Sequence, residues 1–262
     1  MTALKILRYQ LRDVFRSRWV IGYTLLLLAA TELLFRFGGS GERVVLSLLN
    51  VVLILLPLVG LVFGTMYFYH SRHFIELLLT QPVSRSALFA GLFGGVTLPL
   101  AGGFLIGTGL PFLLHGGAAG SAPAALGMLL VLGVLLTLVF TALAFFVALH
   151  VTDRATGLGV AILLWIGFTV VYDGALLLAV ALFNAWPLEG PVLVATLLNP
   201  VDLGRVLLLM QFDVAALMGY TGAVFARFFG SLTGAMIAIG ALTVWAVLPF
   251  LLARRKFLRT DF

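Results

Sequence analysis

The side chains that could bind a metal ion are few in this chain, and they are spread along it. There is no cysteine, and the four histidines are His70, His73, His115 and His150. His70 and His73 are three residues apart, but Arg72 lies between them and no acidic residue converges with both, so a zinc site is disfavoured. Thioethers can bind Cu(I), yet methionines scattered in apolar helices usually pack; here they are Met66, Met128, Met210, Met218 and Met236. The pattern assigns no metal site to this chain.

The lysines exclude ATP hydrolysis by this chain through a phosphate-binding loop. Such a loop requires glycine directly before a lysine that is followed by serine or threonine. The sequence has only Lys5 and Lys256, and neither follows glycine. No residues are arranged for nucleophilic or acid–base catalysis either. We therefore expect a chain that is not an enzyme, and any ATP and Mg²⁺ must bind to a partner chain.

Two acidic residues fall within or beside long apolar runs, where a charge is costly and indicates a specific role. Glu32 is four residues before Arg36, a spacing that allows a local ion pair at the end of a helix. Asp173 follows Tyr172, as an acid does in aspartyl intramembrane proteases, but the second Gly-x-Gly-Asp that such an enzyme needs is missing. Asp173 is instead expected to face a polar seam or a dimer interface.

The composition is that of an integral membrane protein. Of the 262 residues, 62% are hydrophobic and only 10% are charged, and the mean hydropathy is +1.18. A water-soluble domain carries about a quarter charged residues. The net charge of +6 comes from basic residues at chain ends and turns, which indicates membrane orientation and no nucleic-acid partner.

Six apolar runs are long enough to cross a bilayer as helices, since a span needs about 20 residues. They cover residues 19–35, 44–69, 87–114, 124–149, 157–183 and 232–252, and three prolines inside them could kink the helices: Pro57, Pro99 and Pro111. Twelve of the sixteen Lys and Arg residues lie in the N-terminus, the connections 70–86 and 150–156, and the C-terminus. Because basic residues stay on the cytoplasmic side, both termini are predicted to be cytoplasmic.

Three segments lie outside these spans. Residues 1–18 combine an apolar stripe with a basic stripe and are predicted to form a helix in the membrane surface. Residues 71–86 read as a short amphipathic helix that ends at Pro82, and we call this segment the elbow. In residues 184–231, Asn199 as N-cap and Pro200 as first helical residue predict a helix through residue 211, followed by a second helix at about 214–229, both dipping into the outer leaflet.

The elbow sequence IELLLTQPVSRSALF (75–89) resembles the ABC-2 type permease family, and the segments LKILRYQLRD (4–13) and LNPVDLGRV (198–206) resemble its members that serve copper processing for nitrous-oxide reductase maturation. The resemblance covers the chain as one permease domain, 1–262. It implies an all-α, type V exporter-like fold with six transmembrane helices in the bacterial inner membrane. It also implies a coupling helix at Arg72–Leu79 whose contacts with an ATPase are made by Arg72, His73, Phe74, Glu76 and Leu77.

The partners that this resemblance implies are a dimer of a cytoplasmic NosF-like ATPase, a second copy of this chain and a periplasmic NosD-like protein. Contacts with the last are expected at Asn199, Asp202 and Arg205, while copper is handled by partners. Two alternatives remain open. The chain could export a lipid or drug-like substrate, or it could transmit motion to a periplasmic partner without passing any substrate, which its apolar, glycine-rich interior also favours.

Overall fold

The computed structural model describes residues 17–38, 40–80, 83–115, 123–183, 189–212, 228 and 232–260, and the regular structure of this part is entirely helical. The predicted surface helix lies outside these residues up to position 16, as does the second outer helix except for Phe228. The helices are α2 (Arg18–Gly38), α3 (Gly41–His70), α4 (Arg72–Leu79), α5 (Arg85–Leu114), α7 (Pro123–His150), α8 (Arg154–Ile166), the π-helical turn η1 (Gly167–Val171), α9 (Tyr172–Leu182), α10 (Glu189–Leu198), α11 (Pro200–Leu209) and α13 (Leu232–Arg259).

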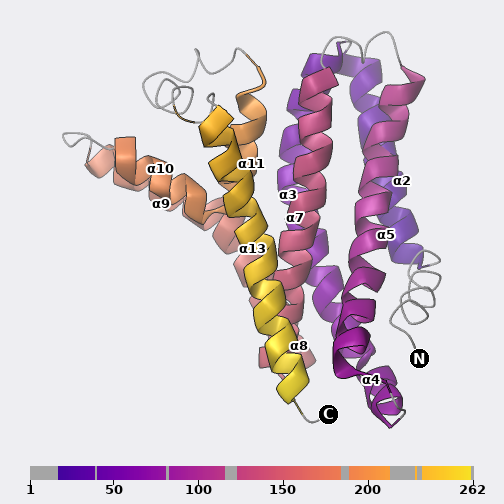
Figure 1. Cartoon of the computed structure of the whole chain (residues 1–262). Helices are drawn as coiled ribbons and strands as arrows, with labels where there is room; N and C mark the ends of the chain where they lie inside the picture. The colour runs from indigo at the N-terminus through magenta and orange to yellow at the C-terminus, as the bar shows by residue number, and fades with distance from the viewer. Residues whose placement is uncertain are drawn as a thin grey trace.

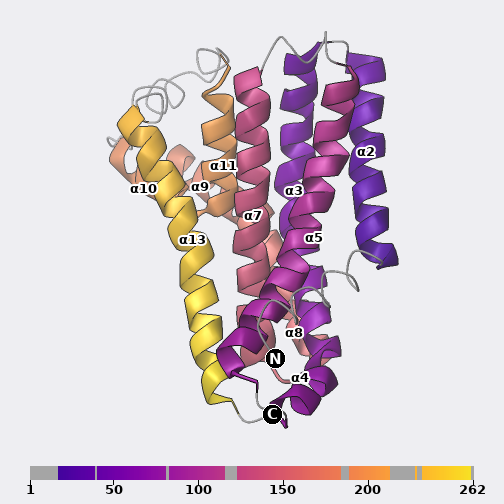
Figure 2. The ribbon, with the colours of Figure 1, turned by 45° about the vertical axis from the view of Figure 1, so that its right-hand side comes forward.

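Six helical segments are long and apolar enough to cross a membrane, which confirms the predicted number of spans. Helices α2, α3, α5, α7 and α13 each form one span, and α8, η1 and α9 together form the span Arg154–Leu182. Helix α13 continues to Arg259, seven residues past the predicted end at residue 252. Helices α2, α3, α5, α7 and α13 run side by side, whereas α9 slants away from them, and the C-terminus and α4 lie at the same end of the bundle (Figures 1 and 2). We call this the elbow end.

Helices α3 and α7 pack closely because small residues meet where they cross. A Cβ added to Gly64 would lie 2.8 Å from the Cβ of Ala144, and one added to Gly60 would lie 3.1 Å from the Cβ of Phe140. Small residues at four-residue spacing allow such close approach in lipid. On the other side of the bundle, Gly107 of α5 does the same against α2, where an added Cβ would lie 2.8 Å from the Cβ of Leu27.

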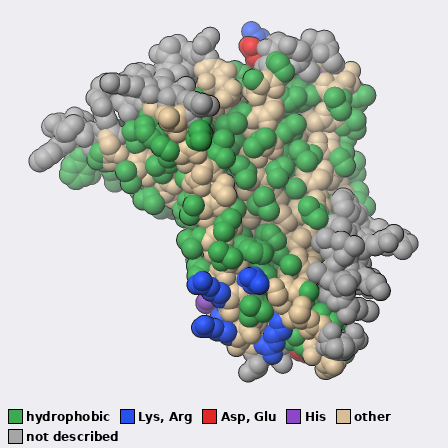
Figure 3. Space-filling view, viewed as in Figure 1, with side chains coloured by type: hydrophobic (Ala, Val, Ile, Leu, Met, Phe, Trp, Pro, Cys, Tyr) green, Lys and Arg blue, Asp and Glu red, His purple; other side chains and the backbone are tan. Residues whose placement is uncertain are grey.

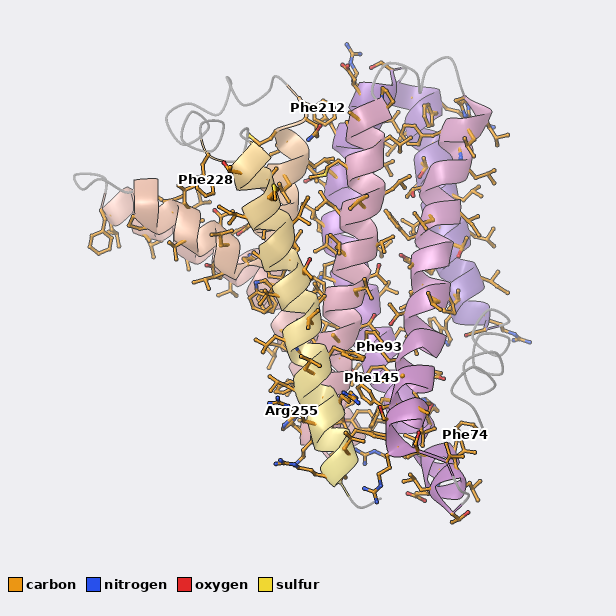
Figure 4. The ribbon with its side chains drawn as sticks, in the orientation of Figure 1. Phe74, Phe93, Phe145, Phe212, Phe228 and Arg255 are labelled. Carbon is orange, nitrogen blue, oxygen red and sulfur yellow. The ribbon has the colours of Figure 1, made fainter. Side chains whose placement is uncertain are left out.

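Aromatic rings fill the elbow end of the bundle between α3, α5, α7 and α13. Phe93 lies with its ring centroid 4.8 Å from that of Phe250 and 5.5 Å from that of Phe145, and Figure 4 shows Phe93 and Phe145 facing each other. Phe257 and Phe68 extend the cluster toward the end of α13. Edge-to-face pairs of this kind add about 0.5–1.5 kcal/mol each beyond the area they bury. The cluster joins α3, α5, α7 and α13 at this end of the bundle.

The spans differ widely in how much of their surface the chain itself covers. In their most apolar windows, 67% of α7 is buried, but only 17% of α13 and 6% of the span Arg154–Leu182. Hydrophobic side chains cover the middle of the molecule, and Lys and Arg gather at the elbow end (Figure 3). An apolar surface of this kind, bounded by charge at one end, suits contact with lipid or with other membrane helices.

Helices α10 and α11 meet at 114° and form a broken span or re-entrant loop. Asn199 is the N-cap of α11, as predicted, and its side-chain oxygen accepts a hydrogen bond from the Val201 backbone N–H at 3.0 Å. Helix α10 was not predicted, because Gly190 and Pro191 indicate a loop. Both residues lie in the first turn of α10, where proline leaves no hydrogen bond unmade.

Candidate functional site

The elbow contains helix α4 at the predicted residues, Arg72–Leu79, and its two faces have different surroundings. Ile75 and Leu78 are buried against the bundle. His73, Glu76 and Leu77 are exposed on the other face, and Leu77 is 68% exposed. The helix therefore presents a mixed apolar and polar surface at the end of the bundle.

Arg72 joins α4 to the end of α7. Its guanidinium donates hydrogen bonds to the backbone oxygens of Thr152 at 2.9 Å, Ala148 at 3.3 Å and Val151 at 3.4 Å, and it lies 4.7 Å from the Tyr69 ring centroid. The last carbonyls of a helix lack partners within the helix and carry the negative end of its dipole. Arg72 donates hydrogen bonds to these carbonyls and places a positive charge at the negative end of the dipole. The position of α4 is therefore coupled to that of α7.

The same junction includes the start of α8. The Tyr69 hydroxyl donates to the Val151 oxygen at 2.8 Å, and a Cβ on Gly157 would lie 2.7 Å from Cζ of Tyr69, so only glycine fits there. Asp153 caps α8 by accepting from the Thr156 backbone N–H at 2.7 Å. That hydrogen bond lowers the pKa of the exposed Asp153 carboxyl. The turn between α7 and α8 is thus fixed by hydrogen bonds from both sides.

The second arginine of the elbow does the same for the last helix. Arg85 Nη1 donates to the backbone oxygens of Thr260 at 2.9 Å and Leu258 at 3.2 Å. From the other side, Arg254 Nη2 donates to the Ser86 hydroxyl at 2.9 Å. The elbow is therefore attached through Arg72 to α7 and through Arg85 to α13. Displacing α4 must move the end of α7 or break the bonds of Arg72, whereas Arg85, the first residue of α5, joins α5 to α13.

The five predicted ATPase contacts differ in how exposed they are. His73, Glu76 and Leu77 lie on the exposed face, and His73 Nδ1 is 3.6 Å from Glu76 Oε2. Phe74 is half-buried beside the hydrophobic core. Arg72 is turned inward and bonded to α7, so the structure gives it a positioning role. Contact of this surface with an ATPase stays a prediction.

A second polar group lies where α9 meets the break between α10 and α11. Arg205 Nη1 is 2.7 Å from Asp173 Oδ2 and 3.1 Å from Asp202 Oδ1. Asn199 Nδ2 donates to Asp202 Oδ2 at 2.9 Å and to the Phe168 backbone oxygen at 2.9 Å, a carbonyl of the π-helical turn. Such turns are irregular backbone that often marks functional positions. Asp173 therefore faces a polar seam, one of the two predicted environments.

The residues predicted to contact a periplasmic partner differ in exposure. Asn199 is 0% exposed and Asp202 is 5% exposed, so their side chains are buried inside the chain, and their contact with a partner stays a prediction. Their hydrogen bonds stabilise the break between α10 and α11. Arg205 is half-buried, and its contact with a periplasmic partner stays a prediction.

Comparison with known proteins identifies the family. No family model matches the chain. The probable ABC transporter permease protein NosY of Pseudomonas aeruginosa is 32% identical over 231 residues, which cover 82% of this chain and 84% of that protein. The protein of the same name from Stutzerimonas stutzeri is 30% identical over 228 residues, covering 79% of this chain and 81% of the relative. This chain belongs to the NosY family of ABC transporter permeases.

As a permease subunit of an ABC transporter, this multi-pass membrane protein implies an ATPase partner. The sequence of this NosY-family permease did not reveal the contacts of Arg72 with α7 and of Arg85 with α13, or the pairing of Asp173 and Asp202 with Arg205. The Glu32–Arg36 pair was predicted and is confirmed, with Arg36 Nε 3.3 Å from Glu32 Oε1. One signal could have found the pair of Asp173 with Arg205: an acid inside a span needs a cation, and Arg205 lies in the adjoining outer segment.

The described part of the permease shows no metal-binding site. Its His, Asp and Glu residues form no group of three or more that could hold a metal ion. His115 comes nearest to an acid at the end opposite the elbow, with Nδ1 3.8 Å from Glu32 Oε2. A pair of ligands does not make a structural site, so the assignment of copper to partner proteins stays a prediction.

Proposed function

We propose that this permease relays the motion of a separate cytoplasmic ATPase, of the NosF type, to a periplasmic task. The observation that carries the proposal is the construction of the elbow. One face of α4 is attached through Arg72 to the end of α7, and the other exposes His73, Glu76 and Leu77. At the other end of the elbow, Arg85 begins α5 and bonds to the end of α13. A surface helix bonded to the end of one span and followed by a second span is suited to pass a rigid-body movement into the membrane.

The proposed task is maturation of the copper site of nitrous-oxide reductase by handling copper or a sulfur species. Its support is the similarity to two relatives named NosY over about four fifths of the chain. In this arrangement two copies of the permease sit on two ATPase chains in the bacterial inner membrane. A periplasmic NosD-like protein contacts the outer face, and Arg205 is the half-buried residue of the predicted outer set that could reach it.

Changing the charge on the exposed face of α4 tests the contact with the ATPase. Glu76→Lys and Leu77→Glu should abolish copurification of the ATPase with the permease, because both change the face that α4 presents outward. Glu42→Lys is the matched control, since Glu42 is also exposed but begins α3 at the opposite end of the bundle. Retention of the ATPase by Glu76→Lys and Leu77→Glu, at the level of the control, would remove the assignment of α4 as the coupling helix.

The maturation role needs a separate measurement. In a strain that lacks this permease, nitrous-oxide reductase isolated from the periplasm should contain less copper and sulfide at its active site, and the wild-type gene should restore both. Glu42→Lys should restore them as well, and Glu76→Lys should not. A fully loaded reductase in the deletion strain contradicts the maturation role but leaves the coupling role of α4 intact.

A second candidate is a mechanotransmitter through which no substrate passes. The tight contacts of Gly60 and Gly64 with α7 and the aromatic cluster around Phe93 favour it, because they leave packed side chains between the spans. Transport assays with ionic copper and sulfide in vesicles containing the ATPase complex separate the two candidates. ATP-driven accumulation of either species speaks against mechanotransmission.

A further inference from the structure

The polar cluster beside α11 has an unusual charge count for a position among membrane helices. It contains two carboxyl groups, Asp173 and Asp202, and one guanidinium, Arg205, whose Nη1 lies 2.7 Å and 3.1 Å from them. Because both carboxyl groups approach the same nitrogen atom, they are also neighbours of each other. Fully ionised, the three side chains carry one net negative charge in a site of low polarity.

Nothing in the described surroundings balances that charge. The Tyr172 hydroxyl donates to the Ala195 oxygen at 2.7 Å, and Trp245 Nε1 donates to the Leu197 oxygen at 3.2 Å, so both are directed to the backbone of α10. Helices α3, α7 and α13, which pack on α11, carry their charged residues and histidines only near their ends. The titratable groups facing the cluster from the described helices are therefore its own members and Tyr172.

One oxygen of the cluster lacks a hydrogen bond. Asp202 is 5% exposed, and its Oδ2 accepts from Asn199, but its Oδ1 is buried with no hydrogen-bond partner among the described residues. Arg205 Nη1 lies near this oxygen, yet it makes its hydrogen bond to Asp173. A buried carboxylate oxygen without a donor is costly, whereas a protonated one becomes a donor itself.

We propose that the cluster binds one proton, held on the Asp202 carboxyl group beside the Asp173 carboxylate. Asp202 is buried and Asp173 is partly buried, and two carboxyl groups that share one such site ionise one at a time, because their negative charges repel each other. The proton brings the net charge of the cluster to zero. A metal cation is disfavoured, since the Arg205 guanidinium already lies against both carboxyl groups and would repel it.

The position of this proton site gives it a structural consequence. Asn199 bonds both to Asp202 and to the carbonyl of Phe168 in the π-helical turn, and it caps α11 at the 114° break. Loss of the proton leaves an uncompensated charge at the point where the π-helical turn meets the break between α10 and α11. The site thus makes the angle between α10 and α11 sensitive to protonation. This inference concerns the chain itself and does not rest on the proposed role in maturation.

The test uses Asp202→Asn, which keeps an acceptor for Asn199 and mimics the protonated acid, in the purified permease in lipid nanodiscs. Thermal unfolding is measured from about pH 5 to about pH 8, a range in which ordinary carboxyl groups stay ionised. The wild-type midpoint should fall as the pH rises, because the folded state binds a proton that the unfolded state has lost. Asp202→Asn should fold and lack this part of the pH dependence. Glu32→Gln, the same change in the pair with Arg36, should behave as the wild type.

Infrared spectroscopy gives an independent signature, because a protonated carboxyl group has a C=O stretching band that should be absent in Asp202→Asn. The proposal is overturned if Asp202→Asn fails to fold, since a permanently ionised ion pair then holds the site together. It is also overturned if Asp202→Asn keeps the pH dependence of the wild type. A wild-type midpoint that follows sodium or potassium concentration at fixed pH, and not pH, identifies a metal cation in place of the proton.

Discussion

The spans of this permease form two groups that are held in place by different forces. Helices α3, α5 and α7 bury 56%, 61% and 67% of their most apolar windows within the chain, whereas the span Arg154–Leu182 buries 6% and α13 buries 17%. The first group, which we call the packed group, is joined by glycine contacts. The second, the exposed group, touches the rest of the chain over narrow stripes, such as Ala238, Leu242, Ala253 and Phe257 of α13. Helix α13 joins the packed group at the elbow end, where its Phe250 and Phe257 enter the aromatic cluster.

Polar contacts take over where apolar packing is sparse. Trp165 of α8 donates to the Ile54 oxygen of α3 at 3.0 Å, Trp245 of α13 donates to α10, and Arg205 pairs with Asp173. Hydrogen bonds fix direction and register, while apolar contact in lipid gives little preference for one neighbour over another. The comparison teaches that the packed group is the rigid part of the molecule and that a few polar side chains position the exposed group on it.

A leucine in place of a glycine should show the largest difference between the groups. Gly64→Leu places a side chain against Ala144 of α7, and we expect a loss of about 3 kcal/mol in unfolding free energy, the upper end for overpacking. Gly159→Leu is the matched control on α8, since a Cβ there has no neighbour within 4 Å. Unfolding in detergent with added denaturant measures both. Equal losses would mean that the exposed group is packed as tightly as α3 and α7.

Removing the anchor of the elbow should have the next largest effect. Arg72→Gln loses hydrogen bonds to three carbonyls at the end of α7, and hydrogen bonds to charged groups contribute about 1.5–3 kcal/mol. Because the side chain is partly exposed, we expect about 1.5 kcal/mol of lost stability. ATP hydrolysis by the complex should continue but drive its task less well. Arg154→Gln, an exposed arginine at the same end, is the control. If ATP hydrolysis drives the task normally in both variants, transmission of motion through α4 does not depend on its bonds to α7.

Much of the fold could be predicted from the sequence, because the signals for its helices are local. Apolar runs gave the spans, the amphipathic pattern of residues 71–86 predicted α4, and a spacing of four residues predicted the pair of Glu32 with Arg36. Contacts between residues far apart leave no periodic trace. Arg72 and Thr152 are separated by 80 positions, and Arg205 and Asp173 by 32. The burial of Asn199 and Asp202 was missed for the same reason, since polar residues in an outer segment suggest a surface.

A smaller loss is expected when a single polar contact of the exposed group is removed. Trp165→Phe deletes the donor to Ile54 and should cost about 1 kcal/mol, the typical net value of one hydrogen bond. Hydrogen exchange of α8 should become faster, while that of α7 should not change. Trp19→Phe is the control for the change of ring, because Trp19 is 78% exposed. Faster exchange throughout the bundle would show that α8 belongs to the packed group.

The smallest effect concerns the turn that joins the two groups. The Thr156 backbone N–H holds the pKa of Asp153 below its usual value. The carboxylate therefore stabilises the start of α8 above the usual aspartate pKa of about 4, and this contribution is lost as the pH falls through the lower pKa of the folded state. After correction for intrinsic rates, hydrogen exchange in residues 154–160 should rise with acidification. In Asp153→Asn, which keeps the cap without the charge, it should not. The same acid dependence in both proteins would place the titrating group elsewhere in the turn.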